Sequence, residues 1–371
     1  MRVLIATGLY PPEVGGPATY VKTLETELPQ GGVGVVVVPF SRARHLPKVI
    51  RHIAYFFILL REGKQCDIIF AQDPVSVGLP AWGAAFFLGK KFLLKVVGDY
   101  AWEQATQRFG NTDTLEAFQK EDLPFFTNLL RSLERFIARR AARVIVPSKY
   151  LSRIVKQWGV DKKKLVVIHN GMDVLADAGN KPVLRGLIKF HGTLIISIGR
   201  LVPWKGFREL IRMAADLKRD FPDLKLMIVG NGPDLPALEE EAAKRGMTDD
   251  VIFTGALPRD VLLRYVRASD LFILNTRYEG FSHQILEVMA VGIPVITTRI
   301  GGNPEVIEHE KNGYLTAPND TRAIEGYAKA LLSDAGLRAS ITAAAKRTVR
   351  QFSNERMAGE TIQLLRELER A

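Results

Sequence analysis

The chain of 371 residues contains one cysteine, Cys66. A single thiol excludes a disulfide framework within the chain and suits a reducing compartment. Long hydrophobic runs are scarce as well: the longest, residues 75–89, is shorter than the ~20 residues that span a bilayer, and it contains Pro80. We expect a buried helix there. The apolar run at the start, MRVLIATG, is too short for a signal peptide and predicts a first strand.

The charge is unevenly distributed along the chain. The formal net charge is +11, and residues 1–176 hold 24 Lys and Arg against 15 Asp and Glu, whereas the remainder holds 27 against 25. Such asymmetry is typical of proteins that meet an anionic partner, which could be a membrane surface, a nucleic acid or an acidic substrate. No module with interleaved basic and aromatic strands is present, so we do not expect nucleic-acid binding.

Short apolar runs alternate with amphipathic stretches, and this alternation occurs twice. Near-continuous runs such as GVVVVPF and RVIVP predict strands that helices cover on both faces, and therefore parallel sheets. A polar segment, residues 173–191, interrupts the rhythm and is our predicted linker. The expected fold is α/β, with two Rossmann-like, doubly wound domains facing each other across a cleft. Ligands of such sheets bind where the strands end.

No GxGxxG fingerprint follows the first strand of either half, which argues against a nicotinamide dehydrogenase. A different glycine signal follows the first strand: Gly15 and Gly16 precede Pro17 at the start of a predicted helix. A glycine pair at that place lets a ligand approach the backbone N–H groups, and the helix dipole favours an anion there.

The second half places cations on a loop after a strand. In SIGRLVPWKGF, Arg200 directly follows the predicted strand, and Lys205 lies where the next helix begins. A planar guanidinium and a compact ammonium are suited to neutralising a diphosphate. The next strand ends in VGNGPD, which brings Gly230 and Asn231 to the same edge.

Two carboxylates flank a predicted helix start in YEGFSHQILEVMA. Glu279 precedes the helix, Ser282 is its expected N-cap, and Glu287 lies inside it. Free N–H groups near the N-cap favour phosphate, and a carboxylate such as Glu287 has two acceptor oxygens that match a vicinal diol such as ribose.

Together these motifs resemble family 4 of the retaining glycosyltransferases, which have the two-domain GT-B fold. The resemblance rests on GGPATYV, VIHNGMD, GRLVPWKGF, VGNGPD, VIFTGAL, YEGFSHQILEVMAVGIPVITT, GGNPEVI and NGYL, which extend over essentially the whole chain. It implies an acceptor-binding domain over residues 1–178, a nucleotide-sugar-binding domain over 181–350, and a terminal helix over 352–371 that packs back onto the first domain.

The resemblance also implies roles for individual residues. Arg200 and Lys205 would hold the diphosphate, Glu287 the ribose, and Glu279 the donor sugar. The remaining donor contacts that it implies are Gly15, Gly16, Gly230, Asn231, Gly280, Phe281 and Ser282.

The chain departs from the family at one catalytic position. Many members have a His after the strand that matches residues 92–97, whereas KVVGDYAWE offers Asp99 and then Glu103. Three roles remain open for Asp99: contact with the donor sugar, orientation of the acceptor hydroxyl, or capping of a helix. We count Asp99, Glu279, Arg200 and Lys205 as the candidate catalytic residues.

The expected reaction is transfer of a hexose from a UDP- or GDP-linked donor to a glycan or lipid-linked acceptor, with retained configuration, in cell-envelope polysaccharide or glycolipid synthesis. No DxD-type carboxylate motif follows a strand and no His/Cys cluster has ligand spacing, so the expectation includes neither a metal nor a cofactor. The rival readings are an epimerase and a phosphorylase on the same architecture. We expect a cytoplasmic protein, with peripheral contact to anionic membrane as a further hypothesis. It rests on basic residues beside apolar helices: Arg42, Arg44, Lys48, Arg51, Arg139, Arg140 and Arg143.

Overall fold

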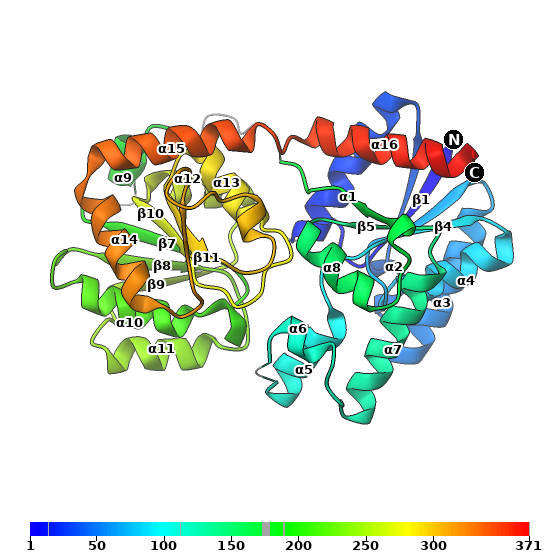
Figure 1. Cartoon of the computed structure of the whole chain (residues 1–371), viewed down its shortest axis with the longest axis horizontal. Helices are drawn as coiled ribbons and strands as arrows, with labels where there is room; N and C mark the ends of the chain where they lie inside the picture. Colours follow the sequence, from blue (N-terminus) through cyan, green and yellow to red (C-terminus); the bar gives the residue numbers. More distant parts are fainter. Residues whose placement is uncertain (14, 112, 173–178, 188–189, 371) are drawn as a thin grey trace. The chain divides into compact units, whose positions relative to one another are not determined.

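The computed structural model describes residues 1–13, 15–111, 113–172, 179–187 and 190–370. The chain forms two compact units: unit 1 comprises Met1–Gly171 with Phe352–Ala371, and unit 2 comprises Met172–Gln351. In each unit a parallel sheet lies between layers of helices (Figure 1). The fold class predicted from the alternating pattern, two doubly wound parallel sheets, is therefore confirmed.

The sheet of unit 1 has the strand order β2-β1-β3-β4-β5-β6, and its strand pairs are parallel. Its strands are β1 (Arg2–Thr7), β2 (Gly34–Pro39), β3 (Ile68–Ala71), β4 (Lys91–Lys95), β5 (Arg143–Val146) and β6 (Leu165–Val167). The chain adds β2 on one side of β1 and then crosses to add β3 on the other. The direction of winding thus reverses between β1 and β3.

The helices of unit 1 connect these strands. They are α1 (Gly16–Glu27), α2 (Ser41–Arg44), α3 (Lys48–Gly63), α4 (Gly78–Leu88), α5 (Tyr100–Phe109), α6 (Leu115–Phe118), α7 (Phe125–Arg140), α8 (Lys149–Gln157) and the terminal α16 (Asn354–Arg370). Helix α16 belongs to this unit because Met357, Leu364 and Leu365 pack into the same core as Leu24 of α1. The two helices lie side by side (Figure 1).

The sheet of unit 2 has the order β12-β11-β10-β7-β8-β9 and is also parallel. Its strands are β7 (Leu194–Ile198), β8 (Lys225–Val229), β9 (Val251–Gly255), β10 (Leu271–Leu274), β11 (Val295–Thr298) and β12 (Tyr314–Thr316). Read from β9, this is the order 3-2-1-4-5-6 of a dinucleotide-binding fold, so winding reverses between β7 and β10.

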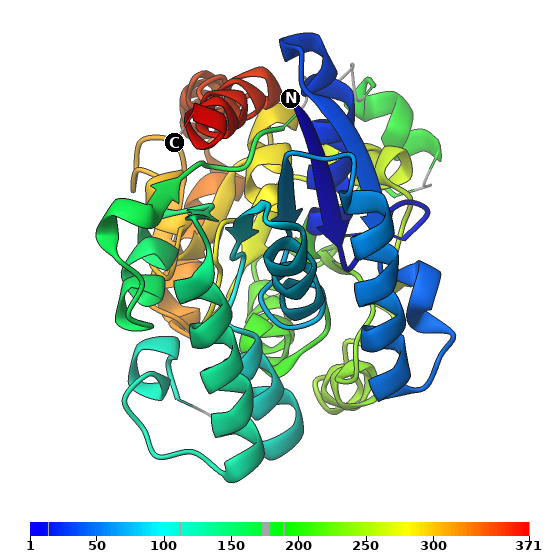
Figure 2. The same ribbon diagram turned by 90° about the vertical axis from the view of Figure 1, so that its right-hand side faces the viewer.

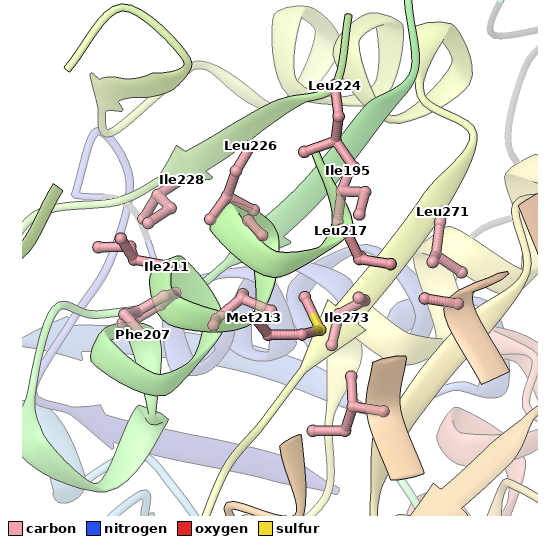
Figure 3. Close-up of a cluster of buried hydrophobic side chains, with 14 of the residues drawn as sticks. Ile195, Phe207, Ile211, Met213, Leu217, Leu224, Leu226, Ile228, Leu271 and Ile273 are labelled. Carbon is pink, nitrogen blue, oxygen red and sulfur yellow. The ribbon is translucent and has the colours of Figure 1, made fainter. Parts of the chain in front are cut away.

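The helices of unit 2 cover both faces of this sheet. They are α9 (Lys181–Leu187), α10 (Phe207–Leu217), α11 (Leu235–Lys244), α12 (Arg259–Ala268), α13 (His283–Val291), α14 (Thr321–Ser333) and α15 (Ala335–Val349). Phe207, Ile211 and Met213 of α10 pack onto Ile195 and Leu226 of the strands (Figure 3). This apolar layer holds the strand ends in fixed positions.

Two sequence expectations about elements are wrong. Within the predicted linker, residues 181–187 form α9, where Arg185 is buried and donates to the Ala268 carbonyl at 2.6 Å and to the Asp270 carboxylate at 2.5 Å. The rest of that prediction falls partly on residues outside the described ranges. The helix predicted over residues 75–89 forms as α4, but it is not buried throughout: Phe86 and Phe87 are 69% and 72% exposed. Among the described residues, no helix combines the length and apolarity needed to cross a bilayer.

Lys95 is a buried lysine at the end of β4. Its Nζ donates to Asn170 Oδ1 at 2.8 Å and lies 2.9 Å from the centre of the Tyr20 ring, and the side chain is 1% exposed. Burial lowers the pKa of Lys95 well below its ordinary value.

We therefore predict that the stability of unit 1 rises with pH between the lowered pKa of Lys95 in the folded chain and the ordinary lysine pKa. In that range the unfolded chain binds a proton at Lys95 that the folded chain does not, so raising the pH favours folding. Lys95→Met should lose this part of the slope. The measurement is urea unfolding at pH 6 and pH 9 for both proteins, and parallel profiles would contradict the prediction.

Candidate functional site in unit 2

Four strands of unit 2 end at one edge of the sheet, and residues of the sequence motifs follow them. Arg200 follows β7, Gly230 follows β8, Glu279 follows β10, and Gly301 follows β11. The neighbours β7 and β10 flank the point where the winding reverses, and such a point leaves room for a ligand beyond the strand ends. The parallel order thus places at one edge residues that are about 100 positions apart in the sequence.

The centre of this edge is an ion pair between two sequence-predicted residues. Lys205 Nζ lies 2.7 Å from Glu279 Oε2, and the two side chains are only 13% and 14% exposed. Lys205 ends a short 3₁₀ turn, Pro203–Lys205, and Gly206 follows it with a φ of 61°. The pair therefore joins the loops after β7 and β10.

Hydrogen bonds between the same loops hold this pair in place. The Arg277 N–H donates to the Trp204 carbonyl at 2.7 Å, and the Thr276 hydroxyl donates to the same carbonyl at 3.2 Å. Asn275, which is buried, donates through Nδ2 to the Gly206 carbonyl at 3.3 Å. Any side chain at Gly206 would collide with Asn275, because its Cβ would lie 2.1 Å from the Asn275 carbonyl.

The glycine pair after β11 supports the Glu279 loop from the other side. The Gly302 N–H donates to the Glu279 carbonyl at 3.0 Å. A Cβ on Gly301 would lie 1.8 Å from that carbonyl, and a Cβ on Gly302 would lie 2.4 Å from the Gly280 carbonyl. The GGNPEVI motif therefore acts as a backbone support for residues 279–281.

Gly230 and Asn231 shape the loop that carries Arg200. The Leu201 N–H donates to the Asn231 carbonyl at 3.0 Å, and a Cβ on Gly230 would lie 2.0 Å from the Gly199 carbonyl. Arg200 itself is exposed. The two glycine-bearing loops after β7 and β8 thus lie in close contact and leave the guanidinium accessible to a ligand.

Helix α13 confirms the predicted cap and adds a residue that the sequence reading missed. The Ser282 hydroxyl accepts the Ile285 N–H, and Gly280, Phe281 and Ser282 are buried. Glu287 accepts a hydrogen bond from Arg259 Nε at 2.9 Å. Arg259 begins α12, and the only sequence signal for it was its place shortly after β9.

Asp99 lies in unit 1 and is fully buried. Its carboxylate caps α5 by accepting the Trp102 N–H at 2.8 Å, and its other oxygen accepts Gln119 Nε2 at 2.7 Å. Burial raises the pKa of Asp99. Of the three roles left open for this residue, the geometry favours the helix cap.

A second buried carboxylate, Glu134, lies at the same helix end. It accepts the Tyr100 N–H at 2.7 Å and the Ala101 N–H at 3.1 Å. Burial, and next the negative charge of Asp99, raise the pKa of Glu134 well above its ordinary value. The sequence reading missed Glu134, because its helix α7 is separated from α5 in the chain.

Unit 1 has a cavity of about 470 Å³ at its own reversal point. Gly8, Gln72, Asp73, Val97 and Tyr100 are among the residues that line it, from the ends of β1, β3 and β4. Gln72 is buried and its Nε2 has no partner. Burial raises the pKa of Asp73. Neither residue carried a sequence signal, because each follows a short strand without a glycine motif.

Gly15 and Gly16, the other two glycines predicted to contact the donor, lie at the start of α1, a few residues after Gly8, which lines this cavity. Gly16 is the first residue of α1, and the Gly15 carbonyl accepts the Thr19 N–H at 3.1 Å. Both belong to unit 1, whereas Arg200, Lys205, Glu279 and Glu287 belong to unit 2. Across the described ranges, no group of three or more His, Cys, Asp or Glu side chains has the geometry to hold a metal ion.

We predict that Gly301→Ala destabilises unit 2 far more than Gly246→Ala. Both glycines have positive φ, 61° and 65°, but a Cβ on Gly246 meets nothing within 4 Å, whereas one on Gly301 collides with the Glu279 carbonyl. The control should cost about 1 kcal/mol from its backbone conformation, and Gly301→Ala roughly 3 kcal/mol once the collision is added. Urea unfolding measures both, and equal losses would show that the GGNPEVI loop tolerates the displacement.

Comparison with known proteins places this geometry in a family. The model of the family "Glycosyl transferases group 1" matches residues 187–348, and that of "Glycosyltransferase Family 4" matches residues 14–174. An uncharacterised glycosyltransferase of Methanocaldococcus jannaschii is 30% identical over 63% of this chain and 62% of its own length. The "GDP-mannose-dependent alpha-(1-6)-phosphatidylinositol monomannoside mannosyltransferase" of Mycolicibacterium smegmatis is 35% identical over 38% of this chain.

The chain thus spans less than two thirds of the length of these relatives, and only 39% of the mannosyltransferase. Among solved structures, Anabaena HepE in complex with UDP-glucose superposes with a TM-score of 0.80, at 20% identity, over 99% of this chain and all of that one. One family model matches most of unit 2 and the other matches most of unit 1. The chain belongs to the family 4, group 1 glycosyltransferases and has their GT-B fold.

Proposed function

We propose that this glycosyltransferase moves a hexose from a nucleoside diphosphate donor held by unit 2 to a hydroxyl held by unit 1, with retention of configuration. The observation that carries the proposal is the Lys205–Glu279 pair at the reversal point between β7 and β10. A cation and an anion side by side there suit the junction of a sugar diphosphate. Lys205 would face the phosphates and Glu279 the sugar hydroxyls.

Each nominated residue has a place in this donor site. Arg200, exposed on the β7 loop, would share the diphosphate with Lys205, and the buried start of α13 would lie against the sugar phosphates. Glu287 would accept the ribose hydroxyls. Arg259 then orients Glu287 through their 2.9 Å contact.

The chemistry follows from where charge develops. In the transition state, positive charge develops on the sugar and negative charge on the leaving diphosphate. Fixed cations beside the diphosphate stabilise this negative charge. A front-face attack, in which the leaving phosphate accepts the acceptor proton, needs no protein nucleophile. We propose that the reaction is independent of divalent metal, since Arg200 and Lys205 supply the two positive charges.

The acceptor site would be the unit 1 cavity. Gln72 Nε2, which has no partner, and the Asp73 carboxylate would hydrogen-bond an acceptor hydroxyl. The mannosyltransferase from Mycolicibacterium acts on a phosphatidylinositol mannoside according to its name. A glycan or lipid-linked acceptor of the cell envelope is therefore our proposal. The nucleotide of the proposed donor is UDP or GDP, since HepE was solved with UDP-glucose and the mannosyltransferase uses GDP-mannose by name.

The first test is calorimetric titration of UDP, GDP and ADP in the presence of EDTA. We expect one nucleotide to bind, and Glu287→Ala to bind it on the order of 10- to 100-fold more weakly, because a hydrogen bond to a charged group is lost. Arg259→Ala is the matched control. It removes the guanidinium that donates to Glu287 at 2.9 Å but leaves the proposed ribose contact of Glu287 in place. It should therefore weaken nucleotide binding by less than Glu287→Ala does.

Two results would contradict this assignment. Equal affinity of wild type and Glu287→Ala would remove Glu287 from the ribose site. Binding that appears only after Mg²⁺ is added would overturn the proposed metal independence.

The diphosphate contact has a separate test. Wild type should bind the preferred nucleoside diphosphate much more tightly than the nucleoside, and Arg200→Ala should reduce that ratio by roughly tenfold or more, because a charge-assisted contact is lost. Affinity for the nucleoside alone should stay unchanged. If Arg200→Ala weakens both ligands equally, the residue does not contact the phosphates.

A further inference from the structure

Three neighbouring helices of unit 1 carry exposed apolar side chains. Helix α4 packs against both α3 and α7, and Figure 2 looks at unit 1 from the side on which these helices lie. We define the aromatic surface as these side chains with the rings beside them: Val49, Ile50, Ile53, Phe56 and Phe57 of α3, Trp82, Phe86 and Phe87 of α4, and Phe125, Leu129 and Phe136 of α7. On α3 the exposed positions recur every three or four residues, so they form one stripe along the helix.

Ring contacts join the exposed side chains of the three helices into one surface. Phe56 of α3 lies 5.8 Å from Phe87, centre to centre, Phe87 lies 5.7 Å from Phe86, and Phe86 lies 6.1 Å from Trp82. Trp82 in turn lies 5.1 Å from Phe136 of α7. Exposing this much connected apolar surface is costly unless something covers it.

A cationic hollow adjoins the aromatic surface. It has a volume of about 410 Å³ and is lined by Ser132, Arg135, Phe136, Arg139 and Arg140. The Arg140 guanidinium lies 5.0 Å from the Phe136 ring centre and 5.9 Å from that of Trp82, so the hollow and the surface share residues. Arg135 Nε is buried without a partner.

Arginine side chains supply the charge that lines this hollow. Within the described parts of the chain, no ion pair involves Arg135, Arg139 or Arg140. The one acidic residue of α4 and α7 is Glu134, which is buried against the start of α5. Arg135 donates to Gln119 and Arg139 to the Trp158 carbonyl, so the hollow offers an anion the remaining donors of these two groups and the Arg140 guanidinium. A partner that fits combines an anionic phosphate with an apolar body.

We propose that this region is a docking site for an anionic phospholipid membrane. A lipid phosphate occupies the hollow, where Arg side chains offer paired donors, and Phe86 and Phe87 insert at the level of the headgroups. Phe57 and Ile53 extend the inserted face along α3. The site lies outside the donor and acceptor sites, so it goes beyond the transfer reaction proposed above.

Vesicle flotation without any nucleotide tests the proposal. Vesicles of phosphatidylcholine with phosphatidylglycerol should carry the protein at low salt, and pure phosphatidylcholine vesicles should not. Arg140→Gln should weaken binding about fivefold, since one basic side chain near the surface is lost. The double variant Phe86→Ser/Phe87→Ser should weaken it by roughly tenfold or more.

Two control variants change the same chemistry in unit 2. Arg219→Gln removes an exposed arginine and Val183→Ser an exposed apolar side chain, and both should bind vesicles as wild type does. Urea unfolding checks that both units of every variant are folded, and nucleotide binding by calorimetry checks the donor site of unit 2. The calorimetry also separates the two proposals, because vesicle binding can fail while nucleotide binding persists, and the reverse.

Three outcomes would overturn the docking site. The first is absence of binding at low salt, and the second is equal binding to both kinds of vesicle or by all variants. The third is that wild type fails to bind vesicles but forms a concentration-dependent dimer in light scattering, and that Phe86→Ser/Phe87→Ser abolishes this dimer. That result would assign the surface to a second copy of the chain.

Discussion

Parallel pairing of β7 with β10 is the constraint on which the donor site of this protein depends. The register places Ile195 beside Leu271 and Ile196 beside Phe272, so both strands end at the same edge of the sheet. The chain leaves β7 in one direction and returns to β10 from the other side, which separates the loops at that edge. Lys205 and Glu279 close the separation with their ion pair. The apolar core of unit 2 therefore fixes the positions of polar side chains that lie outside that core.

The glycines of unit 2 act mainly on the backbone of this site. Gly206, Gly230, Gly301 and Gly302 each lie where a Cβ would meet a carbonyl of a neighbouring loop within 2.5 Å. Of these four, only Gly230 is a donor contact that the sequence resemblance implies. In the structure they let the loops after β7, β8, β10 and β11 approach each other. That close packing of the loops holds Glu279 and Arg200 at the strand ends, where a ligand would bind.

Unit 1 is organised differently. Its sheet begins with the order 2-1-3, its cavity lies at the β1/β3 reversal, and its buried titratable side chains stabilise the scaffold around it. Asp99 and Glu134 satisfy backbone N–H groups at the start of α5, and Lys95 fills the space between Asn170 and Tyr20. Both oxygens of Asp99 already accept hydrogen bonds within unit 1, and the side chain is fully buried. This is why the residue nearest to the expected catalytic position has the geometry of a helix cap.

The sequence alone determined the local chemistry of this protein. Runs of Val and Ile predicted the buried parallel strands, glycines and Ser282 predicted the loops and the cap of α13, and the motif order identified the family. The tertiary structure decided everything that depends on distant residues meeting: the Lys205–Glu279 pair, the support of Glu279 by Gly302, the contact of Arg259 with Glu287, and the partners of Asp99. It also decided which face of an apolar helix is exposed, as Phe57 and Phe86 illustrate. Periodicity cannot distinguish the two faces of a helix that is apolar all round, because only the neighbouring elements determine which face they cover.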